Sequence, residues 1–167
     1  MSDGIAAARI EQRGLYFEEF IEGALYVHAP GRTVTEADNV LFTTLTMNTQ
    51  SLHLDAAWAA GTEFGERLVN SMFTLSTLVG LSVAQLTQGT IVANLGFGQV
   101  AFPAPVRVGD TLYAETVVVG TRLSSSRPGQ GIVEFAHTMR NQRSEVVATA
   151  TRTTLMRCLP AAATEPR

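Results

Sequence analysis

The feature that most constrains this fold is a helical segment near the middle of the chain that is apolar on almost every side. In residues 66–86, apolar side chains recur at spacings of three and four, and further apolar residues fill the other faces. A helix of this kind is buried in a core and does not lie on a surface with one face in water. From residue 88 onward the patterns are those of β-strands. The segment must therefore lie against a sheet as the main helix of the fold.

The strands are predicted from alternating patterns on both sides of this helix. A short one spans residues 24–30, and four longer ones span residues 91–106, 106–123, 131–142 and 145–157. Gly96 and Gly98 interrupt the first long strand, where we expect a bulge or a close backbone approach. His28 alternates out of the short strand and is expected to be exposed or at a rim. Helices followed by antiparallel strands predict an α+β domain with the sheet wrapped round the central helix.

Composition indicates one globular domain. The chain has 167 residues, of which 46% are hydrophobic and 16% charged, and its net charge is −3. This balance favours neither nucleic acid nor a membrane surface as partner. No signal peptide, membrane span or disulfide is expected, the last because Cys158 is the single cysteine. We therefore expect a soluble, cytoplasmic protein with a domain at residues 15–158 and flexible segments at residues 1–14 and 159–167.

Polar residues are concentrated where the helices begin. Thr35 and Asp38 have the spacing of a capping box, which explains Asp38 as a first-turn carboxylate. A polar segment at residues 46–54, expected to be a loop, carries His53, and Asp55 is placed to cap a short helix after it. Asn70 and Ser71 begin the apolar helix, whose first-turn amides can donate to an anion or a carbonyl group.

Four motifs in this order resemble the MaoC-like, or R-specific enoyl-CoA hydratase, family of the hot-dog fold. They are V-T-E-A-D-N-V-L-F, N-T-Q-S-L-H-L-D, F-G-E-R-L-V-N-S-M and F-P-A-P-V-R-V-G-D-T-L, beginning at residues 34, 48, 64 and 102. The resemblance covers residues 15–157. The run T-L-T-M-N-T-Q-S-L-H is also similar to the branch that includes mesaconyl-CoA and itaconyl-CoA hydratases. The resemblance implies a single hot-dog domain that hydrates or dehydrates a short or branched, and in this branch dicarboxylic, enoyl-CoA.

The resemblance implies the following site residues in this chain. His53 corresponds to the catalytic histidine, and Asn48 occupies the position of the family's catalytic aspartate. The thioester carbonyl would be bound by backbone amides at Ser71 and Met72. Candidate substrate-binding residues are Gln50, Phe64, Asn70 and, for the CoA phosphates, Arg127 in the loop S-S-S-R-P-G-Q-G. Neither a metal nor a cofactor other than the CoA of the substrate is expected.

Because Asn48 stands where the family has its catalytic aspartate, two functions other than hydration stay open as hypotheses. An amide can orient a water molecule but cannot accept its proton, so His53 would have to perform both proton transfers. A substrate carboxylate could also supply the missing base. The alternatives are a non-catalytic hot-dog subunit that binds an acyl thioester, and a hot-dog thioesterase. In each case a homodimer or a higher homo-oligomer is expected, because a single sheet leaves one edge and one face of the tunnel uncovered.

Overall fold

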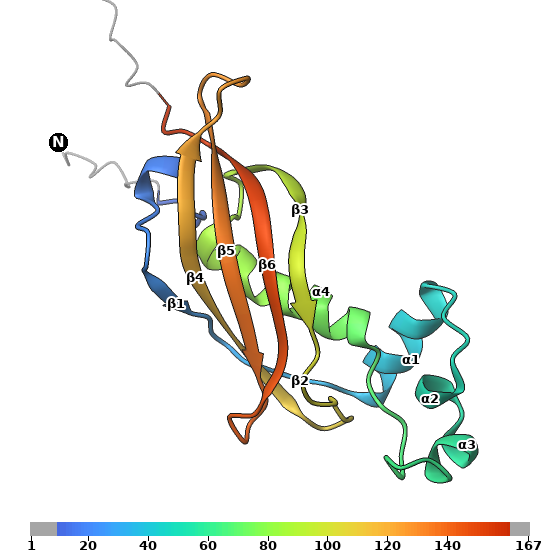
Figure 1. The fold of residues 1–167 in the computed structure, drawn as a ribbon. Coiled ribbons are helices and arrows are strands. Elements are labelled where there is room, and N and C mark those ends of the chain that lie inside the picture. Colours follow the sequence, from blue (N-terminus) through green and yellow to red (C-terminus); the bar gives the residue numbers. More distant parts are fainter. Residues whose placement is uncertain (1–9, 161–167) are drawn as a thin grey trace, which may run out of the picture.

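The computed structural model of the chain describes residues 10–160 (Figure 1). Most of the two segments predicted to be flexible lies outside this range. Within it, the predicted flexible start is already attached to the domain, because the Gly14 N–H donates to the Gln88 carbonyl at 2.8 Å. The helices and strands, in chain order, are η1 (Phe17–Glu19), β1 (Leu25–Val27), β2 (Arg32–Thr33), α1 (Glu36–Leu45), α2 (Ser51–Leu54), α3 (Ala56–Ala60), α4 (Ser71–Leu86), β3 (Ile91–Ala101), β4 (Thr111–Leu123), β5 (Gln130–Arg140) and β6 (Val146–Arg157).

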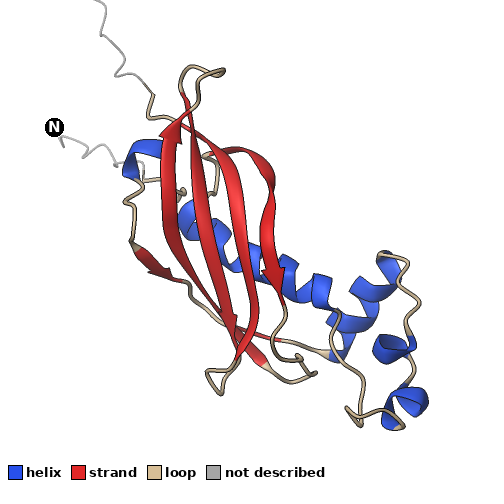
Figure 2. Ribbon diagram, in the orientation of Figure 1, coloured by secondary structure: helices blue, strands red, loops and turns tan. Residues whose placement is uncertain are grey.

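The strands form one antiparallel sheet that curves round α4, as the α+β prediction required (Figures 1 and 2). The strand order is β1-β4-β5-β6-β3, with β2 also paired to β4. β3 is therefore an edge strand. Its pairing with β6 shifts register at several points, one of them between Asn94 and Gly96, which confirms the bulge expected near the glycines. Helices α1, α2 and α3 lie together beyond the N-terminal end of α4 (Figure 1).

The interior consists of two apolar clusters along the length of α4. Leu78 packs in the cluster nearer the start of the helix, with Leu112, Met139 and Ala148. Leu86 packs in the other cluster, with Phe20 and Phe135 among its neighbours. Each cluster takes residues from both the helix and the sheet, so burial of apolar area holds α4 in the concave face.

His28 is not at a rim, contrary to the sequence-based expectation. It is 3% exposed and belongs to a chain of buried hydrogen bonds that also includes His137, which is 1% exposed. Gln85 Oε1 lies 2.9 Å from His28 Nδ1, and Thr116 Oγ1 lies 2.7 Å from His28 Nε2 and 2.8 Å from His137 Nδ1. The alternation of side chains along residues 25–28 was predicted correctly, but the predicted face was wrong: His28 points into the interior, and Leu25 and Val27 are exposed. The bonds to Thr116 and Gln85 satisfy both ring nitrogens of His28 and Nδ1 of His137, whereas Nε2 of His137 is buried without a partner among residues 10–160.

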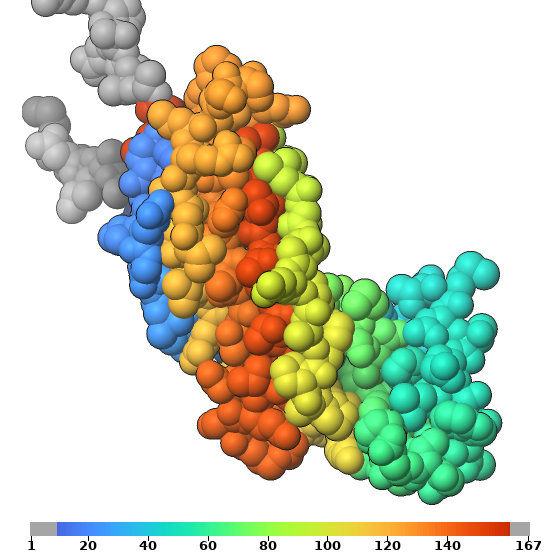
Figure 3. Space-filling model, viewed as in Figure 1, coloured from blue at the N-terminus to red at the C-terminus, as the bar shows by residue number. Residues whose placement is uncertain are grey.

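The helix α4 is covered by this chain on one face. Its fully buried residues are four apart, namely Thr74, Leu78, Ser82 and Leu86. Met72 is 48% exposed, and on the edge strand β3 the side chains of Leu95 and Phe97 are 50% and 41% exposed. In Figure 3, β3 (yellow-green) forms the outer border of the sheet. The sequence predicted a helix buried on almost every side. Within a single chain, this burial is found on one face of α4.

The capping predictions are confirmed, whereas the predicted loop is partly helical. Thr35 and Asp38 form the capping box of α1, and Asp55 accepts a hydrogen bond from Trp58 N at the start of α3. Residues 51–54 form α2, so His53 lies on a helical turn. The sequence there has neither Gly nor Pro to prevent helical backbone. None of the helices in residues 10–160 combines the length and the apolar character needed to cross a membrane.

Candidate active site

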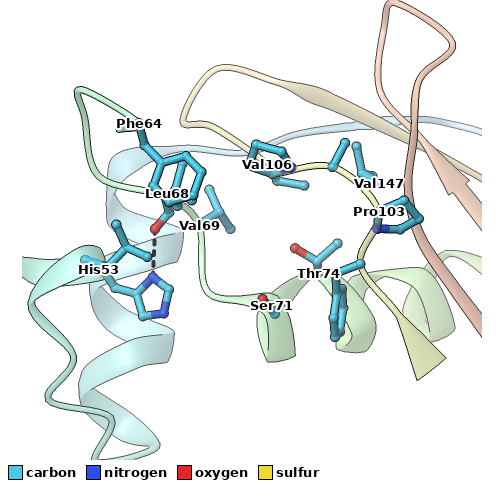
Figure 4. A pocket seen from close by; sticks show the side chains of 13 residues that line it. His53, Phe64, Leu68, Val69, Ser71, Thr74, Pro103, Val106 and Val147 are labelled. Atoms are coloured by element: carbon cyan, nitrogen blue, oxygen red, sulfur yellow. Dashed lines mark hydrogen bonds between the residues drawn. The ribbon is translucent and has the colours of Figure 1, made fainter. Parts of the chain in front are cut away.

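A cavity of about 340 Å³ lies at the N-terminal end of α4 (Figure 4). The polar side chains on its wall are His53 from α2 and Ser71 and Thr74 from α4. The remaining wall is apolar and consists of Leu52, Phe64, Leu68, Val69, Phe102, Pro103, Ala104, Pro105, Val106 and Val147. The segment before α4 is joined to the segment after β3 by a hydrogen bond of 2.9 Å from Val69 N to Val106 O. The cavity thus offers a few polar groups in apolar surroundings, as small-molecule sites usually do.

His53 has one ring nitrogen engaged and the other directed toward the cavity. Its Nδ1 lies 2.9 Å from the Leu68 carbonyl oxygen. A carbonyl oxygen accepts only, so Nδ1 carries the proton and Nε2 of the neutral ring has a free lone pair. Figure 4 shows Nε2 on the side of the ring toward Ser71. The ring is therefore prepared to accept a proton from a molecule in the cavity.

The start of α4 supplies the donor side of the site. Asn70 is the N-cap, and its Oδ1 accepts a hydrogen bond of 2.9 Å from Met72 N. Asn70 is 2% exposed, and its Nδ2 donates to Thr43 Oγ1 at 3.2 Å. Both polar groups of the Asn70 side chain are thus engaged within the chain, and so is the amide of Met72. The prediction that the backbone amides of Ser71 and Met72 bind the thioester carbonyl therefore rests on the amide of Ser71, the first residue of the helix.

Asn48 and Gln50 do not line the cavity. Asn48 Oδ1 accepts a hydrogen bond of 3.0 Å from Gln50 N, a local turn that directs the amide to its own backbone. Met47, the preceding residue, has a φ of 55°. The Met47 N–H donates to the Thr44 carbonyl and the Asn48 N–H donates to the Thr43 carbonyl, and these two bonds end α1. This helix-ending motif determines the direction in which Asn48 leaves α1.

Of the other predicted site residues, Phe64 lines the cavity and Arg127 does not. Arg127 lies in the loop between β4 and β5, at the opposite end of the sheet from α2 (Figure 1). Among residues 10–160, no three histidine, cysteine or acidic side chains come together in a way that could hold a metal ion. The sequence motifs did not point to Thr74, which lines the cavity, or to Asn39, which is fully buried and donates through Nδ2 to the His53 carbonyl at 3.2 Å. One signal was available for Asn39, because a polar residue of low helix propensity stands at the fourth position of α1, just after the first-turn acids.

A sheet wrapped round an apolar helix defines a hot-dog protein, and here a histidine and a helix N-terminus lie at one cavity. The chain belongs to the MaoC like domain family, which matches residues 20–141.

Similar proteins agree with this assignment. Mesaconyl-CoA hydratase of Haloarcula marismortui is 34% identical over 132 residues, which cover 77% of this chain and 36% of that protein. The (R)-specific enoyl-CoA hydratase of Rhodospirillum rubrum is 33% identical over 106 residues, which cover 63% of this chain and 70% of that protein. A Mycobacterium tuberculosis structure described as a double hot-dog fold has a TM-score of 0.79 and 26% identity, covering 95% of this chain and 48% of that one. The chain thus spans little more than a third of the mesaconyl-CoA hydratase.

Proposed function

We propose that this protein is an acyl-CoA hydro-lyase that adds water to, or removes it from, the double bond of a short or branched enoyl-CoA. The observation that carries the proposal is the His53 ring, which donates through Nδ1 to Leu68 and presents Nε2 to the cavity beside Ser71. Membership of the MaoC like domain family supports it. CoA would enter as part of the substrate, without a separate cofactor. The cytoplasmic location expected from the sequence stays a prediction.

In the proposed reaction His53 performs both proton transfers. Nε2 accepts a proton from water while the water oxygen forms a bond to the β-carbon and the π electrons of the double bond move toward the thioester. The Ser71 N–H, at the positive end of the α4 dipole, stabilises the negative charge that develops on the thioester oxygen. The imidazolium then returns its proton to the α-carbon. One water molecule is consumed, and His53 ends in its initial state.

The specific observation that favours a second function is the residue at the family's aspartate position. Asn48 cannot act as a base, and it also lies outside the cavity wall. This arrangement would suit a non-catalytic subunit that binds an acyl thioester. The retained histidine tautomer argues against that alternative, because binding a thioester does not require a proton acceptor in the cavity.

The cavity wall favours an uncharged acyl group. None of the residues that line it is lysine, arginine or a carboxylate. A terminal carboxylate bound against this wall would meet no basic side chain of the same chain, and a carboxylate taken out of water without a partner is unfavourable. A dicarboxylic substrate would therefore need a cation from a second chain.

We also propose that two copies of the chain associate. The uncovered face of α4 and the edge strand β3, with its exposed Leu95 and Phe97, form an apolar surface on one side of the domain. A second hot-dog unit would cover both, as the double hot-dog relative suggests. A stable interface of this kind buries on the order of 2,000 Å² in total. Light scattering at micromolar concentration should give the mass of a dimer or more, and a monomer would contradict the proposal.

One assay tests the activity. The protein is mixed with crotonyl-, tiglyl-, mesaconyl- and itaconyl-CoA, and loss of the enoyl absorbance is followed together with release of free CoA. We expect loss of the absorbance without release of CoA, fastest with the uncharged substrates. Release of CoA would indicate a thioesterase. Binding without either change would indicate a non-catalytic subunit.

A further inference from the structure

We propose that Asn39 is a positioning residue that holds His53 in the catalytic tautomer and orientation. The inference rests on the function proposed above. Asn39 lies in α1 and is 0% exposed. It touches neither the cavity nor any substrate position, so it would act through its neighbours.

The side-chain amide of Asn39 joins three parts of the site. Its Nδ2 donates to the His53 carbonyl and to the Leu68 carbonyl, each at 3.2 Å. Its Oδ1 accepts a hydrogen bond of 2.9 Å from Asn70 N. One amide thereby links α2, the segment before α4 and the N-cap of α4. These are the elements that carry the histidine, the acceptor of its Nδ1 proton and the start of the thioester-binding helix.

The Leu68 carbonyl connects Asn39 to the histidine ring. It accepts from Asn39 Nδ2 at 3.2 Å and from His53 Nδ1 at 2.9 Å. A carbonyl oxygen has two lone pairs, so both are occupied. If the carbonyl turned away from the ring, it would break its bond to Asn39 and leave one N–H of this fully buried amide unpaired, which is unfavourable. The direction of the carbonyl then determines that the proton stays on Nδ1 and that Nε2 is free for chemistry.

Other side chains cannot replace this amide. Aspartate has no hydrogen to give the two carbonyl oxygens and would bring a buried negative charge toward them. Leucine has a similar shape but would leave two carbonyls and one N–H with fewer partners. Serine is shorter and offers one donor where the site uses two. The requirement for two donors and one acceptor in a small planar group is specific to asparagine at this depth.

The neighbouring Thr43 offers a matched control. It lies one turn further along α1, is also 0% exposed, and its Oγ1 accepts from Asn70 Nδ2 at 3.2 Å. It shares the burial and the link to the N-cap of α4, but no hydrogen bond connects its side chain to His53 or Leu68. Loss of stability alone should affect the variants of both residues, whereas a positioning role should appear only in those of Asn39.

The test compares Asn39→Ser, Asn39→Asp and Thr43→Val in the full chain. Nitrogen-15 NMR of the His53 ring, recorded without substrate, reports which nitrogen carries the proton, and kinetics with crotonyl-CoA give kcat and KM. We expect the wild type and Thr43→Val to have the proton on Nδ1 and similar kcat values. The Asn39 variants should show a mixture of tautomers and a kcat lower by about 10–100-fold, with KM changed less than threefold.

Two results would overturn the inference. One is an Asn39 variant that folds and keeps the wild-type tautomer and kcat. The other is a Thr43→Val protein in which the tautomer changes as much as in the Asn39 variants. Asn39→Ser retains the test if the buried charge of Asn39→Asp prevents folding, because serine introduces no charge and leaves room for water. The NMR measurement of the tautomer does not depend on turnover. If the wild type hydrates no enoyl-CoA, the proposed function is refuted, and the tautomers of the wild type and the variants still decide whether Asn39 positions His53.

Discussion

Acidification from pH 7.5 to pH 5.0 should destabilise this protein through the buried His137. Burial, followed by the nearby charge of Arg152 and by His28, lowers the pKa of His137 from 6.5 to about 3. Its Nδ1 meets the Thr116 hydroxyl at 2.8 Å, while Nε2 has no partner among the described residues. The folded protein therefore keeps this ring neutral at a pH where the unfolded chain protonates it.

The sign and the size follow from proton linkage. The folded pKa lies below the unfolded one, so the unfolded state binds more protons between about pH 3 and pH 6.5 and stability falls as the pH falls. One pKa unit corresponds to about 1.4 kcal/mol, so the whole effect approaches roughly 5 kcal/mol at low pH. Between pH 7.5 and pH 5.0 the loss is about 2 kcal/mol. Burial also lowers the pKa of His28, which adds to the loss in the same direction.

Carboxylates contribute little in this interval. For Asp110, burial favours a higher pKa, but hydrogen bonds from Arg107 N, Gln142 and Arg143 outweigh it and hold the pKa below 3.8. The stability that such a group supplies is present above its unfolded pKa and is lost as the pH falls through the folded one. That loss lies below pH 5. The interval from pH 7.5 to pH 5.0 therefore isolates the histidines.

Urea denaturation at fixed protein concentration measures the effect. The free energy of unfolding of the wild type should fall by about 2 kcal/mol or more between pH 7.5 and pH 5.0, and that of His137→Gln should fall by about 2 kcal/mol less. The ring protons of His137 should show no titration in the folded protein above pH 5. An equal loss in both proteins, or a folded-state titration near pH 6.5, would refute the reasoning.

Three further predictions concern the site. His53→Ala should lower kcat by roughly 100-fold or more with the fold intact by circular dichroism, and an unchanged kcat would refute the proposed acid–base role. Asn48→Ala and Asn48→Asp should each change kcat less than about tenfold, because Asn48 lies outside the cavity wall. An increase in kcat of more than about tenfold in Asn48→Asp would show instead that the wild-type site lacks a base. Arg127→Ala should leave KM for enoyl-CoA unchanged, since Arg127 lies in the loop between β4 and β5 and does not line the cavity of its own chain. A raised KM would place this loop of a second chain at the site.

Local sequence was sufficient for the features that depend on neighbours in the chain. The capping box of Thr35 and Asp38 and the Asp55 cap were predictable because each cap joins residues three apart. The buried helix and the strand order along the chain followed from periodicity, which reports how each element meets an apolar layer. His53 was found through its motif, and the structure places it on the cavity.

The tertiary structure decided which polar groups meet across distant segments. Asn48 and Asn70 occupy motif positions, yet a turn to Gln50 and the cap of α4 engage their side chains. Asn39 meets the carbonyls of His53 and Leu68, which are 14 and 29 residues away, and His28 reaches Thr116 across 88 residues. Alternation along a strand shows only that a side chain changes face. Whether a polar side chain on the inner face finds a partner there depends on the packing of the whole domain, because the partner comes from another element.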